Sequence, residues 1–333
     1  MPADMAGWDV HTHLIPPTVL AAAYQGLFGL AVDDGFLLVD GERLPLKRLA
    51  DPAALLAWVD EQELDGAVVS VPPALFRYDQ GVEWADLVNQ GLRELATPQL
   101  RVLGQLPLHD PSAAAVASAL ASEGVFSGFA LGTAGLTGLD SGAGVAAGAG
   151  PASGAGPAGT AAVAGLDAVW EALHELEAFT LIHPSHSHDE RLGRYYLSNL
   201  LGNPYETGLA VAELVFGDVV GRFPGIRFCL CHGGGVTAAL AGRWQRGIDT
   251  ARPGIGPLSL SVPEALQRFY VDDLVHDDGV RVLLGATFGA DRVLAGSDWP
   301  FPMGDQVDRG RAAARSTVCE QLTRPLKKGG VSP

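Results

Sequence analysis

The stretch WDVHTHLIPP, residues 8–17, places two of the nine histidines in the chain one residue apart, directly after a short apolar run. In a β-strand, residues two apart point to the same face. If residues 8–10 form a strand, His11 and His13 emerge together where it ends, which is a position that can hold a metal ion. The alternative is a solvated turn that happens to contain two histidines, so the interpretation depends on what the other strand ends carry.

Short apolar, β-branched runs recur along the chain, and segments with helical periodicity lie between them. The expected strands cover residues 8–10, 67–71, 102–106, 128–131, 179–182, 226–231, 269–271 and 293–295. The expected helices cover residues 52–63, 82–96, 112–122, 167–177 and 207–222. Strands that alternate with helices predict a parallel sheet, and eight such strands predict a closed (β/α)₈ TIM barrel. An open doubly wound sheet is the alternative, but no glycine-rich phosphate loop follows the first strand.

We expect residues 1–333 to form a single barrel domain with two irregular segments. Residues 137–165 consist almost entirely of Gly, Ala, Ser and Pro, a composition that buries too little apolar surface to offset its ordering entropy. They predict a flexible insertion after the fourth strand, on the barrel face that carries the histidines, acting as a lid or being a neutral low-complexity expansion. Residues 307–333 lack the pattern of a closing helix and form a divergent C-terminal tail.

Composition places the chain among globular enzymes of the cytoplasm. Its 47% hydrophobic content supports a sizeable core, and no apolar run reaches the roughly 18 residues of a membrane span. The N-terminus lacks the pattern of a secretory signal. Three cysteines are too few for a disulfide framework and favour a reducing compartment. The net charge of −16 argues against a nucleic-acid partner but allows a small anionic substrate held by a few pocket arginines.

Residues that can bind a metal stand at several expected strand ends, where barrel enzymes collect their catalytic groups. His183 follows the fifth strand and Asp298 follows the eighth, so with His11 and His13 they offer three imidazoles and one carboxylate. This set suits Zn²⁺ with water in an open position. The fourth strand carries no lysine or glutamate to bridge a second ion, so we expect one ion per chain.

His232 follows the sixth strand and precedes three glycines, whose missing side chains we expect to leave room for a substrate. It fits better as an acid or base beside metal-bound water than as a further ligand. Zn²⁺ brings the pKa of bound water to about 7, within reach of a histidine partner.

The motifs HTH, IHP, CHGGG and GSDWPFP together resemble the amidohydrolase superfamily. The resemblance covers most of residues 6–306 and is greatest to the branch of metal-dependent decarboxylases typified by α-amino-β-carboxymuconate-ε-semialdehyde decarboxylase. It implies a TIM barrel in which zinc is bound by the HxH pair, the strand-five histidine and the strand-eight aspartate, and in which the histidine before GGG acts on the metal-bound water or the substrate. By match these are His11, His13, His183, Asp298 and His232.

The resemblance also implies substrate contacts. Arg43 and Arg243 stand where the family holds substrate carboxylates, the second from a neighbouring subunit, which implies a homodimer. Arg48 competes with Arg43 because loop alignment is loose, and a surface arginine is the alternative for both Arg43 and Arg243. Trp299 and Phe301 either pack on a flat conjugated substrate or form a hydrophobic floor. His186 and His188 are either solvated loop residues or extra substrate contacts.

These features predict a zinc-dependent decarboxylase of a small unsaturated or aromatic carboxylic acid, with His232 preparing the metal-bound water. A metal-dependent hydrolase of a lactone, amide or related bond needs the same residues and remains the alternative. A catalytically idle barrel that serves as a binding or scaffold protein is a third interpretation, against which the intact set of five residues argues.

Overall fold

The centre of the molecule is a set of parallel strands in a computed structural model that describes residues 6–137, 165–187 and 189–326. They are β1 (Trp8–His13), β5 (Gly66–Ser70), β6 (Leu100–Val102) continued by β7 (Gly104–Gln105), β8 (Phe129–Gly132), β9 (Phe179–His183), β10 (Arg227–Leu230), β11 (Tyr270–Asp272) and β12 (Val293–Leu294). Each of the eight predicted strands is present, although several begin or end at other residues than predicted.

The strands are joined into a ring by backbone hydrogen bonds. Pairing runs β1–β5–β6 in one sheet and β7–β8–β9–β10–β11–β12 in the other. β6 and β7 are consecutive parts of one extended segment, so they join the sheets at one edge. At the other edge Val10 N–H donates to the Ala295 carbonyl at 3.0 Å, and His13 N–H donates to the Trp299 carbonyl at 2.9 Å. The arrangement is the predicted TIM-barrel α/β fold.

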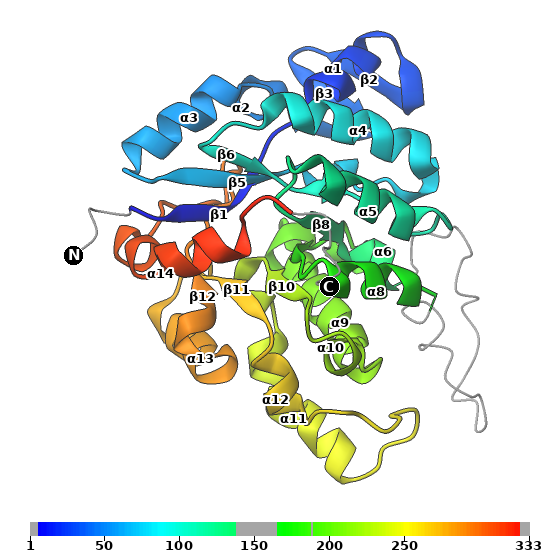
Figure 1. Ribbon diagram of the computed structural model, residues 1–333, viewed down its shortest axis with the longest axis vertical. Coiled ribbons are helices and arrows are strands. Elements are labelled where there is room, and N and C mark those ends of the chain that lie inside the picture. Colours follow the sequence, from blue (N-terminus) through cyan, green and yellow to red (C-terminus); the bar gives the residue numbers. More distant parts are fainter. Residues whose placement is uncertain (1–5, 138–164, 188, 327–333) are drawn as a thin grey trace, which may run out of the picture.

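The described helices lie outside the strands, and most of them cover the strands (Figure 1). They are α1 (Pro17–Tyr24), α2 (Leu46–Leu49), α3 (Pro52–Glu61), α4 (Gly81–Leu95), α5 (Ala113–Glu123), α6 (Thr133–Thr137), α8 (Asp167–Glu175), α9 (Asn203–Phe216), α10 (Val219–Arg222), α11 (Thr237–Asp249), α12 (Val262–Leu266), α13 (Asp278–Phe288) and α14 (Arg309–Leu322). Strands such as β5 and β9 are therefore buried along their whole length, which explains their continuous apolar sequences. The single helix predicted over 207–222 is two, because Asp218 at φ +55° interrupts it.

A small antiparallel sheet between α1 and α2 was not predicted. It consists of β2 (Leu30–Asp33), β3 (Phe36–Val39) and β4 (Glu42–Pro45). Two Asp-Gly turns connect its strands, and all four turn residues have positive φ, between 44° and 88°. Asp-Gly is a strong signal for a two-residue hairpin, so the sequence did contain the information.

The expectation that no closing helix follows Gln306 is wrong, because α14 packs against the start of the barrel. Asp308 caps it by accepting from Arg311 N–H at 3.0 Å. Its buried face has helical spacing but is built largely from small or weakly apolar residues, namely Ala312, Ser316, Cys319 and Leu322. That composition explains why the pattern is weak in the sequence.

Two other expectations, on residues 137–165 and on the domain organisation, concern residues that the structure does not describe. The Gly/Ala/Pro-rich segment lies outside the described residues except at its ends, so its role stays a prediction, as does the single-domain organisation of the whole chain. Among the described residues, no helix combines the length and the apolar character that crossing a membrane requires.

One partly buried cluster attaches α14 to the barrel, and it yields a stability prediction. Glu320 accepts from Trp8 Nε1 at 3.0 Å and from Arg101 Nη2 at 2.6 Å, while the Arg101 guanidinium lies 3.7 Å above the Trp8 ring. Glu320→Ala should lower the free energy of unfolding by about 1–3 kcal/mol, since charged hydrogen bonds are lost. Urea unfolding measures this. Glu320→Gln keeps an acceptor and should lose less; an equal loss in both variants would contradict this account.

Candidate metal centre and active site

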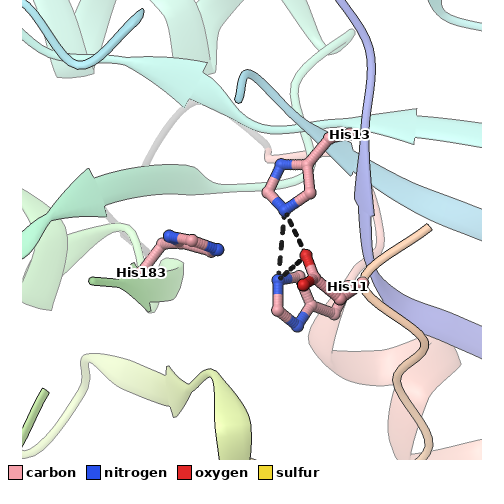
Figure 2. A group of neighbouring side chains, drawn as sticks. His11, His13 and His183 are labelled. Atoms are coloured by element: carbon pink, nitrogen blue, oxygen red, sulfur yellow. Dashed lines mark hydrogen bonds and ion pairs between the residues drawn. The ribbon is translucent and has the colours of Figure 1, made fainter. Parts of the chain in front are cut away.

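Four side chains of the kind that bind metals meet at the carboxyl ends of the strands. His11 and His13 lie on β1, His183 ends β9, and Asp298 lies in the segment after β12. One potential ligand atom from each lies within 4.8 Å of the others, and all four residues are buried. Figure 2 shows the rings of His11, His13 and His183 gathered around one point. The structure therefore brings together the four residues that the sequence singled out.

Three of the inner atoms of this group lie about as close together as hydrogen-bonded atoms. His11 Nε2 and His13 Nε2 are 3.2 Å apart (Figure 2). Asp298 Oδ1 lies 3.3 Å and 3.0 Å from these two atoms. His183 Nε2 is buried and has no hydrogen-bond partner among the described residues. A buried polar atom without a partner costs free energy, so the arrangement favours a ligand bound between these side chains.

The outer nitrogens determine which way the imidazoles are protonated. His11 Nδ1 lies 2.8 Å from Asp272 Oδ2, His13 Nδ1 lies 3.1 Å from the Val71 carbonyl, and His183 Nδ1 lies 2.8 Å from the Pro184 carbonyl. Carbonyl and carboxylate oxygens only accept, so each Nδ1 carries the hydrogen. In the neutral rings the Nε2 lone pairs then face one another, which is unfavourable unless a cation lies between them. Three nitrogens and one carboxylate oxygen fit a divalent transition metal.

The electrostatics of the group favour its metal-binding protonation state for most members. Burial, reinforced by the neighbouring histidines, holds the pKa of His183 well below its usual value. Burial would raise the pKa of Asp298, but the neighbouring imidazoles of His11, His13 and His232 hold it well below its ordinary range. At His11 burial lowers the pKa, yet Asp298 and Asp272 outweigh it and the net shift is upward. A metal would have to displace a proton there.

His232 stands beside this group at the end of β10. Its Nε2 lies 3.5 Å from Asp298 Oδ2, and its Nδ1 is buried with no partner among the described residues. The side chain lines a cavity of about 310 Å³ together with Asp298, Leu274 and Met303. It therefore faces both the metal ligands and a space that can hold a small molecule, as an acid or base requires.

The three glycines after His232 serve the packing of the turn. A Cβ on Gly233 would lie 2.4 Å from Val275 Cγ1, and one on Gly235 would lie 2.3 Å from the Pro204 carbonyl oxygen. A Cβ on Gly234 would lie 3.1 Å from Leu230 Cδ1. All three have φ between 60° and 74°, where a side chain is unfavourable. Protein atoms therefore fill the space into which a Cβ on these glycines would point, while Gly235 lines the cavity beside His232, so the expectation that missing side chains leave room for a substrate stays a prediction for Gly235.

A second, larger cavity of about 770 Å³ lies next to the first, and Asn203 lines both. The turn between β3 and β4 and the loop after β5 form its walls. Arg77 lines it, although only 7% of the residue is exposed, and donates to the Phe28 carbonyl at 2.6 Å and to Asp40 Oδ1 at 3.0 Å. Arg77 was not predicted, since nothing in its loop sequence marks it.

The predicted substrate-binding residues are placed less uniformly. Arg43 lies on β4, where it is exposed, faces Asp33 at 3.5 Å and lines neither cavity. Arg48 lines a smaller cavity of about 240 Å³ together with Trp299 and Phe301. The Phe301 ring is 5.2 Å from the His13 ring, whereas Trp299 is almost fully buried. Arg243 is exposed on α11.

Of the two additional loop histidines, His186 is exposed and lines the larger cavity, 3.8 Å from Glu42. His188 lies outside the described residues.

Asp272 is a site residue that sequence reasoning missed. It ends β11, is fully buried, and contacts His11. The rule that found the other residues, a polar side chain at the end of a barrel strand, also applies to the seventh strand. It would have identified Asp272 had it been applied there.

Comparisons with known proteins identify the family of this chain. The family model described as "Amidohydrolase" matches residues 8–321. A 2-amino-3-carboxymuconate-6-semialdehyde decarboxylase from Dictyostelium discoideum is 35% identical over 142 residues, which cover 42% of this chain and 39% of that protein. The matches span less than half the length of the curated relatives.

Solved structures share the fold at low sequence identity. The 5-carboxyvanillate decarboxylase from Sphingomonas paucimobilis has a TM-score of 0.73 and 19% identity, covering 97% of this chain and 100% of that chain. The 5-carboxyvanillate decarboxylase from Novosphingobium aromaticivorans, complexed with manganese and 4-hydroxy-3-methoxy-5-nitrobenzoic acid, has a TM-score of 0.71 and 18% identity over 95% of both chains.

The arrangement predicts which histidines hold a metal. His183→Ala removes one of four ligands and should strip the ion from the purified protein. His186→Ala, three residues along the same loop, should retain it because His186 does not belong to the converging group. Elemental analysis after gel filtration measures both. Full occupancy in His183→Ala would contradict the assigned ligand set.

Proposed function

The chain belongs to the amidohydrolase family, and we propose that it is a metal-dependent decarboxylase of a small unsaturated or aromatic carboxylic acid. The observation that carries the proposal is the convergence of three imidazole Nε2 atoms and Asp298 beside His232 and a cavity of about 310 Å³. Curated relatives named as decarboxylases, matched over part of their length, support the reaction type.

We propose Zn²⁺ as the resident ion, at one per chain. Three imidazoles and one carboxylate suit Zn²⁺, while the manganese of the Novosphingobium enzyme belongs to that protein. A bridging ligand for a second ion would have to come from the end of β8. There a Cβ on Gly132 would lie 2.7 Å from Ser185 Oγ and 3.0 Å from Phe76 Cβ, so packing leaves no space for such a side chain.

The bound ion would supply a Lewis acid at the edge of the cavity. The chain's own residues would do the rest. Phe301, near His13, and Phe76, whose ring is 6.4 Å from that of His183, place flat apolar surfaces beside the metal ligands. Phe76 lines the cavity of about 770 Å³ and Phe301 lines the cavity of about 240 Å³, so these surfaces suit a planar conjugated substrate that extends from the metal ligands toward one of those cavities.

His232 would handle the proton. In decarboxylation the bond between the substrate carbon and its carboxylate breaks, the electron pair remains on that carbon, and the carbon gains a proton as CO₂ leaves. His232 reaches the cavity and is held beside Asp298, so it can store that proton and transfer it. Hydrolysis of a lactone or amide would use the same residues, but no feature of the site favours it.

The proposal is tested by metal analysis followed by a screen for CO₂ release across aromatic and conjugated carboxylic acids. We expect about one ion per chain and release of CO₂ from a subset of the acids. His232→Asn should keep the ion but lose at least ~10²-fold in rate, the usual size of an acid–base contribution. Lactone or amide hydrolysis without any CO₂ release would overturn the proposal, and loss of the ion in His232→Asn would make His232 a ligand.

We also propose that the active unit is a homodimer in which Arg243 reaches the neighbouring cavity. Within α11 only Thr237 is buried, and Figure 1 shows this helix projecting away from the strands. Exposed apolar side chains also lie at the rim of the cavity of about 310 Å³ that His232 lines: Leu200 is 52% exposed and Val280 is 39% exposed. Both features support a subunit contact at the cavity mouth.

The remaining assignments are proposals of the same kind. Arg43 could contact a substrate only if its ion pair with Asp33 opened, and Arg48, beside Phe301, is the alternative. Trp299 supports the floor of the site. We propose a cytoplasmic location because Cys229, Cys231 and Cys319 are all free and buried.

Subunit mixing tests the shared site. Arg243→Ala should weaken substrate use about tenfold or more, because a charge-assisted contact to a carboxylate is lost. Mixing Arg243→Ala with His232→Asn should restore part of the activity, since one cavity of each mixed dimer has both residues intact. Arg246→Ala, on the same exposed helix, should behave as the wild type. No recovery, with subunit exchange confirmed, would place Arg243 outside a shared site.

A further inference from the structure

One buried carboxylate contacts both a metal ligand and the turn that carries the acid–base residue. Asp272 Oδ2 accepts from His11 Nδ1 at 2.8 Å and from the backbone N–H of His232 at 3.0 Å. Asp272 Oδ1 accepts from Gly233 N–H at 2.9 Å and from Leu274 N–H at 3.2 Å. Two donors to each oxygen use the full acceptor capacity of a carboxylate.

The partners of Asp272 differ from those of an ordinary structural carboxylate. Within the described residues it forms no ion pair with lysine or arginine, although it is fully buried. The next residue, Asp273, shows the ordinary pattern, with an ion pair to Arg311 at 2.7 Å. The contacts of Asp272 are instead with the His11 ring and with backbone N–H groups of the turn that carries His232.

We propose that Asp272 is a positioning residue that couples the metal ligand His11 to the acid–base residue His232. Its carboxylate keeps the hydrogen of His11 on Nδ1, so that Nε2 presents its lone pair to the metal. The same carboxylate holds the turn that aims His232 at the cavity. This inference rests on the roles given to His11 and His232 in the proposed function, and it adds the element that aligns the two.

The turn needs such support. His232 has φ +54° and Gly233 has φ +61°, and the left-handed region is unfavourable for a residue with a side chain such as histidine. The two N–H groups bound by Asp272 belong to these two residues. Without that acceptor, the turn loses the interactions that compensate its backbone conformation, and His232 loses its alignment.

Asp272→Asn is the discriminating variant, because it preserves size while replacing one oxygen by an NH₂ group that cannot accept. In either amide orientation one of the two turn N–H groups faces a donor. His11 either faces a donor as well or retains only a neutral acceptor, so its Nε2 binds metal less well. Asp273→Asn is the matched control, since it makes the same change one residue away without contacting His11 or His232.

Two measurements independent of turnover test the proposal. In Zn²⁺ titrations against a competing chelator, Asp272→Asn should bind about 10- to 100-fold more weakly than the wild type. In hydrogen–deuterium exchange at saturating Zn²⁺, peptides covering residues 228–237 should exchange faster. Asp273→Asn should show neither change beyond any general loss of stability, which thermal unfolding of the metal-free proteins records. Equal behaviour of the two variants in both measurements would overturn the proposal.

A third measurement needs no variant and applies even if Asp272→Asn does not fold. Wild-type protein labelled with ¹⁵N-histidine and loaded with ¹¹³Cd²⁺ should show three imidazoles coupled to the metal through Nε2, each with its hydrogen on Nδ1. A metal-bound ring coupled through Nδ1 would overturn the assigned contacts. Failure of the wild type to bind Cd²⁺ or Zn²⁺ at all would instead refute the proposed function.

Discussion

The contact between the first barrel strand and the segment after the last one is the constraint on which the site depends. His11 and His13 come from β1 and Asp298 follows β12, so these ligands meet only where the ring of strands closes. The closure is held by the Asp298 N–H, which donates to the His11 carbonyl at 2.8 Å. Asp9 reinforces it by accepting from Ser297 N–H at 3.0 Å and from His11 N–H at 3.1 Å. The barrel must therefore close before His11, His13 and Asp298 can meet.

The sequence predicted the parts that repeat and missed the parts that depend on packing. The strands follow from apolar runs, and the ligands follow from polar residues at strand ends. Asp272 also stands at a strand end, so its position could have been predicted from the sequence. The packing role of Gly233 and Gly235 could not have been predicted, because only the structure shows that Val275 and Pro204 occupy the space beside them. The buried arginine of the larger cavity, Arg77, lies in a loop whose course no periodicity predicts.

The negative net charge of the chain opposes the binding of an anionic substrate, and a bound metal ion would counteract this repulsion locally. A protein with net charge −16 repels an anionic substrate at long range, and the larger cavity adds Asp40, Glu42 and Asp79 to its lining. A divalent cation held by three neutral imidazoles and Asp298 would leave about one positive charge at the ligand group, so the attraction for a carboxylate would come from the centre of the site and not from its walls. Asp272, 2.8 Å from His11 Nδ1, would offset part of that charge, so the attraction would act at short range.

The division between ligands and walls also explains how one scaffold can serve different substrates. The proposed metal ligands and Asp272 lie on or beside strands, where their positions follow from the barrel. The walls come from the β3–β4 turn, the loop after β5 and the start of α9, whose sequences are free to change without moving the ligands. Arg77 joins two of these walls through Asp40, at the tip of the small sheet. Substrate preference would then be set by the loops of the cavity walls, whose sequences were the hardest to interpret. The chemistry would be set by the residues at the strand ends, which the sequence pattern predicted.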